Sequence, residues 1–261
     1  SSMAMLVELR ISTWTARKRD NETTADLNKA KQADSDAGSV YKYLMAGSDH
    51  LKKIEKYAAK CRAWNAQQTL PWMKGVGLLP MANFFAYREQ LGTMEANFNA
   101  LVSDFVTVYP TLVSAQAFKL GDYFDATEFP DADSLPKRFK FGFNFLPVPE
   151  QYDKMFNEKL AEAMREPWER LHAVLTHMSD RLTDSNTGER NIFRDSIVNK
   201  PLELCGLLSK LNVTNDPQLE EARRMLEKAL SGVDAQDLRD LSSARAELKS
   251  SVQEIIGKFN W

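Results

Sequence analysis

The chain has 261 residues, 43% of them hydrophobic, which is enough to bury a sizeable core in one large domain or two small ones. Its 34 basic and 36 acidic residues give a net charge of −2, which excludes a uniformly basic nucleic-acid coat, so any nucleic-acid binding needs a local patch. With two cysteines and no apolar run near the roughly 20 residues that span a bilayer, we expect a cytoplasmic protein without a membrane partner.

The first predicted element is a β-strand over residues 6–16, where apolar and polar side chains alternate. The polar stretch that follows, from RKRDNETTAD to about Gly38, predicts an exposed loop or linker with a short helix near residues 27–33. Another short helix is expected over residues 40–44, and a longer one after the N-cap candidates Ser48 and Asp49. The longer helix should end before TLPWMKGVGLLP, which two prolines and two glycines interrupt.

Two long helices carry apolar stripes with heptad spacing. The first stripe consists of Phe84, Tyr87, Leu91, Met94, Phe98, Leu101, Phe105, Val108 and Leu112. The second consists of Met164, Trp168, Leu171, Leu175, Met178 and Leu182. Pro110 is expected to bend or end the first helix near Tyr109. The matching stripes predict an antiparallel coiled-coil-like pair, which closes either within the chain or between chains of a homo-oligomer.

The stretch FKFGFNFLPVP predicts a second strand over residues 138–146, because phenylalanine occupies every second position from Phe139 to Phe145. A strand needs a hydrogen-bonding partner, so we expect this one to pair with residues 6–16, antiparallel or, as the open alternative, parallel. The phenylalanine face should pack on helices, since burying a Phe contributes roughly 1.5–3 kcal/mol. The alternative role for the four rings is an exposed platform on which bases stack.

These elements predict a mainly α protein with long heptad-patterned helices and a small two-stranded antiparallel β ribbon. Residues 1–185 are expected to form one helical unit, closed by a ribbon with strands at about residues 6–16 and 138–146. Residues 190–261 are expected to form a helical C-terminal region, in which Asp216 followed by Pro217 marks a helix start.

An antiparallel ribbon would bring two basic segments together at one of its ends. The resulting candidate nucleic-acid site comprises Arg17, Lys18, Arg19, Lys137, Arg138, Lys140 and Trp14. Clustered lysine and arginine suit a phosphate backbone, and an adjacent tryptophan suits an unstacked base. The alternative is a solvated strand end whose charge is balanced by Asp20, Glu22, Asp131 and Asp133. With parallel strands the cluster would not form.

The sequence has no GxxxxGK[ST] phosphate loop, no GxSxG, no HExxH and no paired CxxC. Glu169 and His172 form one ExxH pair, whereas a di-metal carboxylate bundle needs two such motifs and further carboxylates. Cys61 and Cys205 lie on apolar helix faces and are expected to be small core residues. We therefore expect no enzymatic activity, no metal and no cofactor.

Four segments carry a resemblance to known proteins: LRISTWTARKRD, TLPWMKGVGLLP, FKFGFNFLPVP and IFRDSIVNKPLELCGLLSKLNVTNDPQL. Together they resemble a group of uncharacterised proteins encoded by bacteriophages and mobile elements. The layout is also similar to a family of unknown function whose members are encoded beside a MoxR/CobS-like AAA+ ATPase. The resemblance implies a cytoplasmic accessory protein of DNA metabolism in a host bacterial cell, with an AAA+ ATPase as a candidate partner. It carries over no functional residues.

The leading hypothesis is a non-enzymatic accessory protein that binds single- or double-stranded DNA through the basic end of the ribbon. The alternative is a coiled-coil interaction or assembly protein with no nucleic-acid role, in which the heptad stripes mediate self-association or hold a partner helix. An enzyme with an unrecognised site would instead show a buried polar pocket with shifted carboxylate or histidine pKa values.

Overall fold

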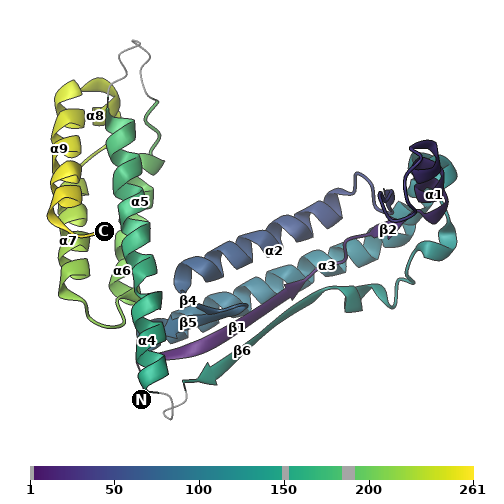
Figure 1. Ribbon diagram of the computed structural model, residues 1–261, viewed down its shortest axis with the longest axis horizontal. Coiled ribbons are helices and arrows are strands. Elements are labelled where there is room, and N and C mark those ends of the chain that lie inside the picture. The colour runs from purple at the N-terminus through teal and green to yellow at the C-terminus, as the bar shows by residue number, and fades with distance from the viewer. Residues whose placement is uncertain (1–2, 149–152, 184–191) are drawn as a thin grey trace. The chain divides into compact units, whose positions relative to one another are not determined.

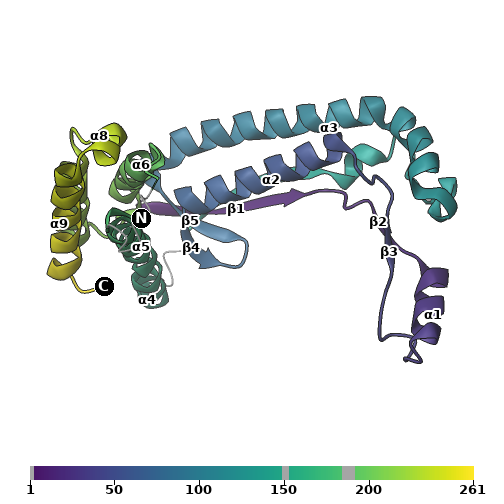
Figure 2. The same ribbon diagram turned by 90° about the horizontal axis from the view of Figure 1, so that it is seen from above.

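The computed structural model describes residues 3–148, 153–183 and 192–261 (Figures 1 and 2). The chain folds into two compact units. Unit 1 comprises Ser1–Glu8, Asn65–Tyr87 and Asn144–Trp261, and unit 2 comprises Leu9–Trp64 and Arg88–Phe143. The division predicted at residues 185–190 lies outside the described residues, and the helix before it belongs to the same unit as the C-terminal helices.

The main sheet has four antiparallel strands, in the order β4-β5-β1-β6. They are β1 (Ala4–Ser12), β4 (Leu70–Met73), β5 (Val76–Pro80) and β6 (Lys140–Pro147). β1 and β6 are neighbours and run in opposite directions, as the pairing of the two predicted strands requires (Figure 1). The prediction of a small two-stranded ribbon is nevertheless wrong, because β5 covers the other edge of β1, from Ala4 opposite Pro80 to Glu8 opposite Val76.

The β4–β5 hairpin is built from the residues that argue against a strand in the sequence. Gly75 lies in its turn with a φ of +77°, a conformation that residues with a Cβ rarely adopt. Gly77 packs so closely on Thr69 that an added Cβ would lie 2.6 Å from the threonine hydroxyl oxygen. Pro71 is tolerated because β4 is an edge strand. Glycine and proline therefore shape this hairpin rather than interrupt the chain.

The polar segment after β1 is ordered, which corrects the prediction of a loop or linker. It contains β2 (Arg17–Arg19) and α1 (Asn21–Ala30), and β2 pairs with β3 (Tyr41–Tyr43) where the sequence predicts a short helix. Asn28 is buried, and its amide donates to the carbonyls of Ser35 and Gly38 at 3.0 Å each. The backbone N–H of Val40 donates to the Thr24 hydroxyl at 2.9 Å. Buried polar groups therefore order this segment, and the sequence lacks the apolar periodicity that would have predicted its order.

Most of the core of unit 2 comes from α2 (Asp49–Gln68) and α3 (Phe84–Leu120). Side chains of both helices, among them Ile54, Ala58, Phe98 and Phe105, form one buried cluster. The sequence predicts that Pro110 bends or ends this helix near Tyr109, and since α3 continues beyond Pro110 to Leu120, an end at that point is wrong. The first heptad stripe is therefore largely buried within the chain.

The phenylalanine face of β6 packs along α3, as predicted. The ring centroid of Phe139 lies 6.0 Å from that of Phe105, and Phe141 lies 5.6 Å from Phe98. Phe145 lies 5.0 Å from Phe84. Phe139 is buried and the other three rings are half-buried, so these side chains serve the core rather than an exposed platform.

Unit 1 contains a helical bundle joined to the β4–β5 hairpin. Its helices are α4 (Asp153–Ala163), α5 (Arg165–Leu182), α6 (Ser196–Leu211), α7 (Pro217–Leu230), α8 (Ala235–Asp240) and α9 (Ser242–Lys258). The buried residues of the second stripe, such as Leu171 and Leu175, belong to the core of this bundle, where α5 packs on α9. Phe98 and Phe105 of the first stripe belong to the other core, so neither core supports the predicted coiled-coil-like pair between the two stripes.

Candidate nucleic-acid interface

The β2–β3 ribbon of unit 2 sorts its six side chains onto two faces. The register places Arg17 opposite Tyr43, Lys18 opposite Lys42 and Arg19 opposite Tyr41. Opposed residues of an antiparallel pair share a face, and the face alternates at each step along the strand. Arg17, Arg19, Tyr41 and Tyr43 therefore lie on one side, which we call the ribbon face, and the two lysines lie on the other.

Hydrogen bonds beyond both ends of the ladder hold the ribbon in place. The N–H of Leu44 donates to the carbonyl of Ala16 at 2.7 Å, and the N–H of Asp20 donates to the carbonyl of Val40 at 2.9 Å. The Asp20 carboxylate then accepts from the N–H of Thr23 at 2.8 Å and caps α1, which lies between β2 and β3 in the chain (Figure 2). The short strands are thus fixed by their flanks, and their side chains project from an ordered backbone.

The lysine side of the ribbon is electrostatically compensated by the segment after α3. The side chain of Lys42 is only 9% exposed, pairs with Glu128 at 2.8 Å and donates to the carbonyl of Tyr123 at 2.9 Å. Hydrogen bonds from Thr127 lower the pKa of the Asp125 carboxyl, and the ammonium groups of Lys42 and Lys18 act in the same direction. Lys42 therefore contributes to the internal structure of unit 2, whereas Lys18 is exposed and acts on Asp125 through its charge.

The ribbon face is exposed and combines cations with aromatic rings. Tyr41 is 39% exposed and Tyr43 58%, and both arginines are exposed. The Cζ atom of Arg17 lies 3.8 Å from the ring centroid of Tyr41, a cation–π contact. Within the described part of the chain, neither arginine has an ion-pair partner. Two guanidinium groups and two phenol rings therefore face solvent together.

Trp14, the aromatic residue predicted to stack on a base, lies in the core of unit 2. It is 9% exposed, and its ring centroid lies 6.4 Å from that of Phe105 and 6.2 Å from that of Tyr109. A base could not reach its faces without unpacking this cluster. The exposed rings come instead from Tyr41 and Tyr43, which the sequence analysis did not identify. The signal in the sequence is the pair of segments RKR and YKY, and it becomes visible only when the two are paired as strands.

The second predicted basic group is exposed and begins next to the same aromatic cluster. Lys137 and Arg138 lie in the 3₁₀ turn η4 (Leu135–Arg138), and Lys140 is the first residue of β6. Phe139, between them, contacts Phe105 as Trp14 does. Burial raises the pKa of Tyr109 to about 12, and the positive charge of Arg138 opposes that shift. The two basic segments thus adjoin one cluster, as expected from antiparallel strands.

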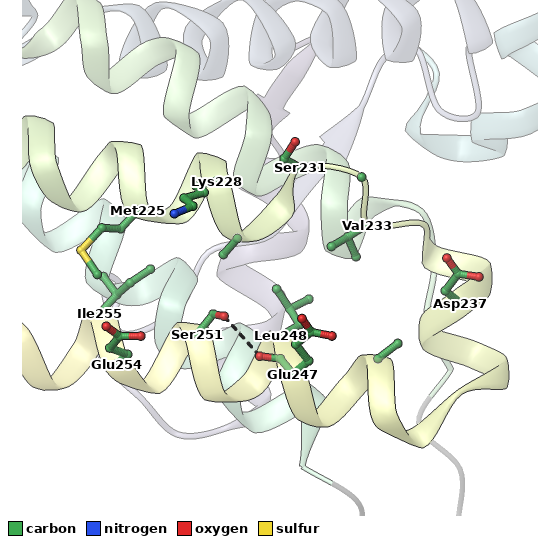
Figure 3. A pocket seen from close by; sticks show the side chains of 13 residues that line it. Met225, Lys228, Ser231, Val233, Asp237, Glu247, Leu248, Ser251, Glu254 and Ile255 are labelled. Atoms are coloured by element: carbon green, nitrogen blue, oxygen red, sulfur yellow. Dashed lines mark hydrogen bonds between the residues drawn. The ribbon is translucent and has the colours of Figure 1, made fainter.

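A groove of about 580 Å³ lies between α7 and α9 in unit 1 (Figure 3). Met225, Leu248 and Ile255 line it with apolar surface. Its charged lining residues are Lys228 and three carboxylates, Asp237, Glu247 and Glu254. An excess of carboxylates repels phosphate, so this groove is poorly suited to nucleic acid.

The histidine and the cysteines that the sequence offers for chemistry pack against other side chains. The ring of His172 stacks on Trp261 with centroids 5.0 Å apart. In the parts of the chain that the structure describes, no three His, Cys, Asp or Glu residues are grouped to hold a metal ion. Cys61 and Cys205 are both buried, as expected, and burial raises the pKa of the Cys205 thiol to about 11. Burial also raises the pKa of the Cys61 thiol. Both thiols therefore remain protonated at neutral pH.

The chain belongs to a family described as protein of unknown function (DUF3150), whose model matches residues 2–245. No curated protein and no solved structure matches it. Across the described residues, we find no helix with both the length and the apolar character to cross a membrane.

Proposed function

We propose that this protein is a non-enzymatic accessory protein that binds nucleic acid, and that the ribbon face is its main contact surface. The observation that carries the proposal is the pairing of RKR with YKY, which places Arg17, Arg19, Tyr41 and Tyr43 on one exposed side. Arginines neutralise phosphates, and tyrosine rings stack on bases of any sequence. On the opposite side Lys42 is ion-paired with Glu128, so of the two faces the ribbon face is the one that combines exposed cations with exposed rings.

Lys137, Arg138 and Lys140 extend this surface in the proposal. They are exposed and begin beside the cluster that anchors Trp14. A strand of nucleic acid that contacts the ribbon face would gain further phosphate contacts by continuing along them. Trp14 is left out of the contact surface because it is buried.

The resemblance of the sequence to phage and mobile-element proteins supports the proposal that this protein is encoded by such an element and works with an AAA+ ATPase. The competing role, assembly through the heptad stripes, has less support. The apolar side chains of those stripes largely fill the cores of the two units and leave little stripe surface for a partner.

The test is fluorescence anisotropy of labelled oligonucleotides, titrated with the protein at low and at moderate salt. Arg17→Ala/Arg19→Ala should weaken binding at least about tenfold and reduce the magnitude of the salt slope by roughly 1.4–1.8, because each lost phosphate contact accounts for about 0.7–0.9. Arg224→Ala/Lys228→Ala removes two exposed cations from α7 and should leave binding unchanged. Equal losses from both pairs would show a general charge effect and contradict the proposal.

A further inference from the structure

A hollow of about 380 Å³ lies between the β2–β3 ribbon and the first turns of α2. Tyr43 lines this hollow and also belongs to the ribbon face. Its other lining side chains include Thr15, Met45, Leu51, Lys52 and Glu55. All of them come from unit 2. The hollow is therefore a concave space directly beside one of the two exposed rings.

The backbone around the hollow is held in uncommon conformations. Ala16 has a φ of +50° and is buried, although a residue with a Cβ usually costs roughly 1–2 kcal/mol there. Gly47 has a φ of +76° on the segment that leads into α2. Both residues line the hollow. Glycine adopts this conformation without strain, whereas the strain at Ala16 persists only where surrounding structure enforces it, as often happens at binding sites.

The chemistry of the lining suits a nucleobase. The Tyr43 ring offers a stacking surface, and Met45 and Leu51 are apolar. The Thr15 hydroxyl and the Glu55 carboxylate can hydrogen-bond to a base edge. Lys52 lines the hollow and is exposed, and the ammonium of Lys119 lies 3.6 Å from the position of a Cβ added at Gly47, another lining residue, so a phosphate beside the hollow would find cations nearby.

We infer that this hollow receives an unstacked base and that the ligand of the ribbon face is single-stranded nucleic acid. In a duplex, each base is stacked between its neighbours and paired at its Watson–Crick edge, so it cannot enter without a cost in unpairing. A single strand presents the ring and its edge freely. The inference rests on the proposed function, because the arginines of the ribbon face are the phosphate contacts that bring the base to the hollow.

The experiment compares a labelled oligothymidine, the same strand with abasic sites and a duplex of equal length, by anisotropy at one salt concentration. The intact strand should bind at least about tenfold more tightly than the other two. Thr15→Tyr, which fills the hollow from an exposed position, should remove this preference while binding of the abasic strand is unchanged. Tyr43→Ala should weaken binding of the intact strand about tenfold, and Tyr43→Phe should restore it.

The possible failures are distinguishable. Binding that depends on Arg17 and Arg19, but is equal for intact strand, abasic strand and duplex, would overturn this inference and leave the proposed function standing. A Thr15→Tyr variant that keeps the full preference, with unchanged circular dichroism, would also overturn it. No binding of any of the three at low salt would overturn both.

Discussion

The guanidinium of Arg17 lies over the ring of Tyr41, with Cζ 3.8 Å from the ring centroid. The two residues are diagonal neighbours across the ribbon, since Tyr41 is directly opposite Arg19 and Arg17 is opposite Tyr43. The contact fixes the direction of a long side chain that would otherwise sample many rotamers. It therefore lowers the entropy that the arginine loses when it contacts a phosphate.

Arg17→Lys should separate this geometric effect from charge. The ammonium keeps the positive charge but forms a weaker contact with the ring, so we expect binding of nucleic acid to weaken about two- to fivefold, the equivalent of 0.5–1 kcal/mol at an exposed site. The salt dependence, measured by anisotropy at several salt concentrations, should not change. Wild-type affinity in the lysine variant would show that only charge matters at this position.

Asn28→Ala should destabilise the segment that joins β2 to β3. The substitution leaves the carbonyls of Ser35 and Gly38 without their donor, at a cost of roughly 1–3 kcal/mol in the free energy of unfolding. Urea denaturation followed by circular dichroism measures the loss. Asn97→Ala is the control, because its exposed amide bonds only to the Tyr57 hydroxyl, and it should cost less than about 1 kcal/mol.

Phe105 and Phe118 form a matched pair on α3. Phe105 is fully buried and contacts the rings of Trp14, Tyr109 and Phe139, whereas Phe118 is 92% exposed. Phe105→Ala should lower the free energy of unfolding by roughly 3–5 kcal/mol, and Phe118→Ala should change it by less than about 0.5 kcal/mol. Equal effects in thermal or urea unfolding would contradict the described core of unit 2.

Gly77 and Gly142 form a second matched pair, in two strands of the main sheet. An added Cβ at Gly77 would lie 2.6 Å from the Thr69 hydroxyl oxygen, whereas at Gly142 it would meet nothing within 4 Å. Gly77→Ala should therefore cost roughly 1–3 kcal/mol of stability. Gly142→Ala should be neutral or slightly stabilising in the same urea titration. A neutral Gly77→Ala would mean that β4 and β5 are not paired in this register.

The ion pairs of α7 give a stability difference that depends on pH. Hydrogen bonds from Arg223, 2.8 Å at the closest, hold the pKa of Glu220 below its ordinary value of 4.5. A lowered carboxyl pKa stabilises the fold fully above the ordinary value, and the contribution is lost as the pH falls through the lowered one. Arg223→Met should thus melt below the wild type at neutral pH, and the difference should shrink progressively below about pH 4.5. A difference that is constant with pH would argue against this ion pair as its source.

Periodicity in the sequence predicts the long elements and one long-range pairing correctly. The alternation around Val7 and Phe141 identifies two strands, and because each needs a hydrogen-bonding partner and the sequence shows no other clear strand, it predicts their pairing. The apolar stripe of α3 likewise predicts a buried helix face. Which stripe packs on which helix was not predictable, because heptad spacing describes one face and not its partner.

The rest of the fold depends on interactions that leave no periodic signal. Thr24 and Asn28 order a polar segment through hydrogen bonds between their side chains and the backbone, and Gly77 permits one close approach to Thr69. The candidate interface likewise depends on residues that no periodic pattern in the sequence identifies. The basic residues are predicted from their positions beside the two predicted strands, but the exposed rings of Tyr41 and Tyr43 become apparent only when β3 is paired with β2.

Ultraviolet cross-linking to a bromodeoxyuridine-substituted single strand, followed by peptide mapping, tests the central claim most directly. The account predicts adducts on Tyr43 or Tyr41, lost in Arg17→Ala/Arg19→Ala and retained in Arg224→Ala/Lys228→Ala. Adducts confined to peptides of unit 1, or unaffected by loss of the two ribbon arginines, would contradict it.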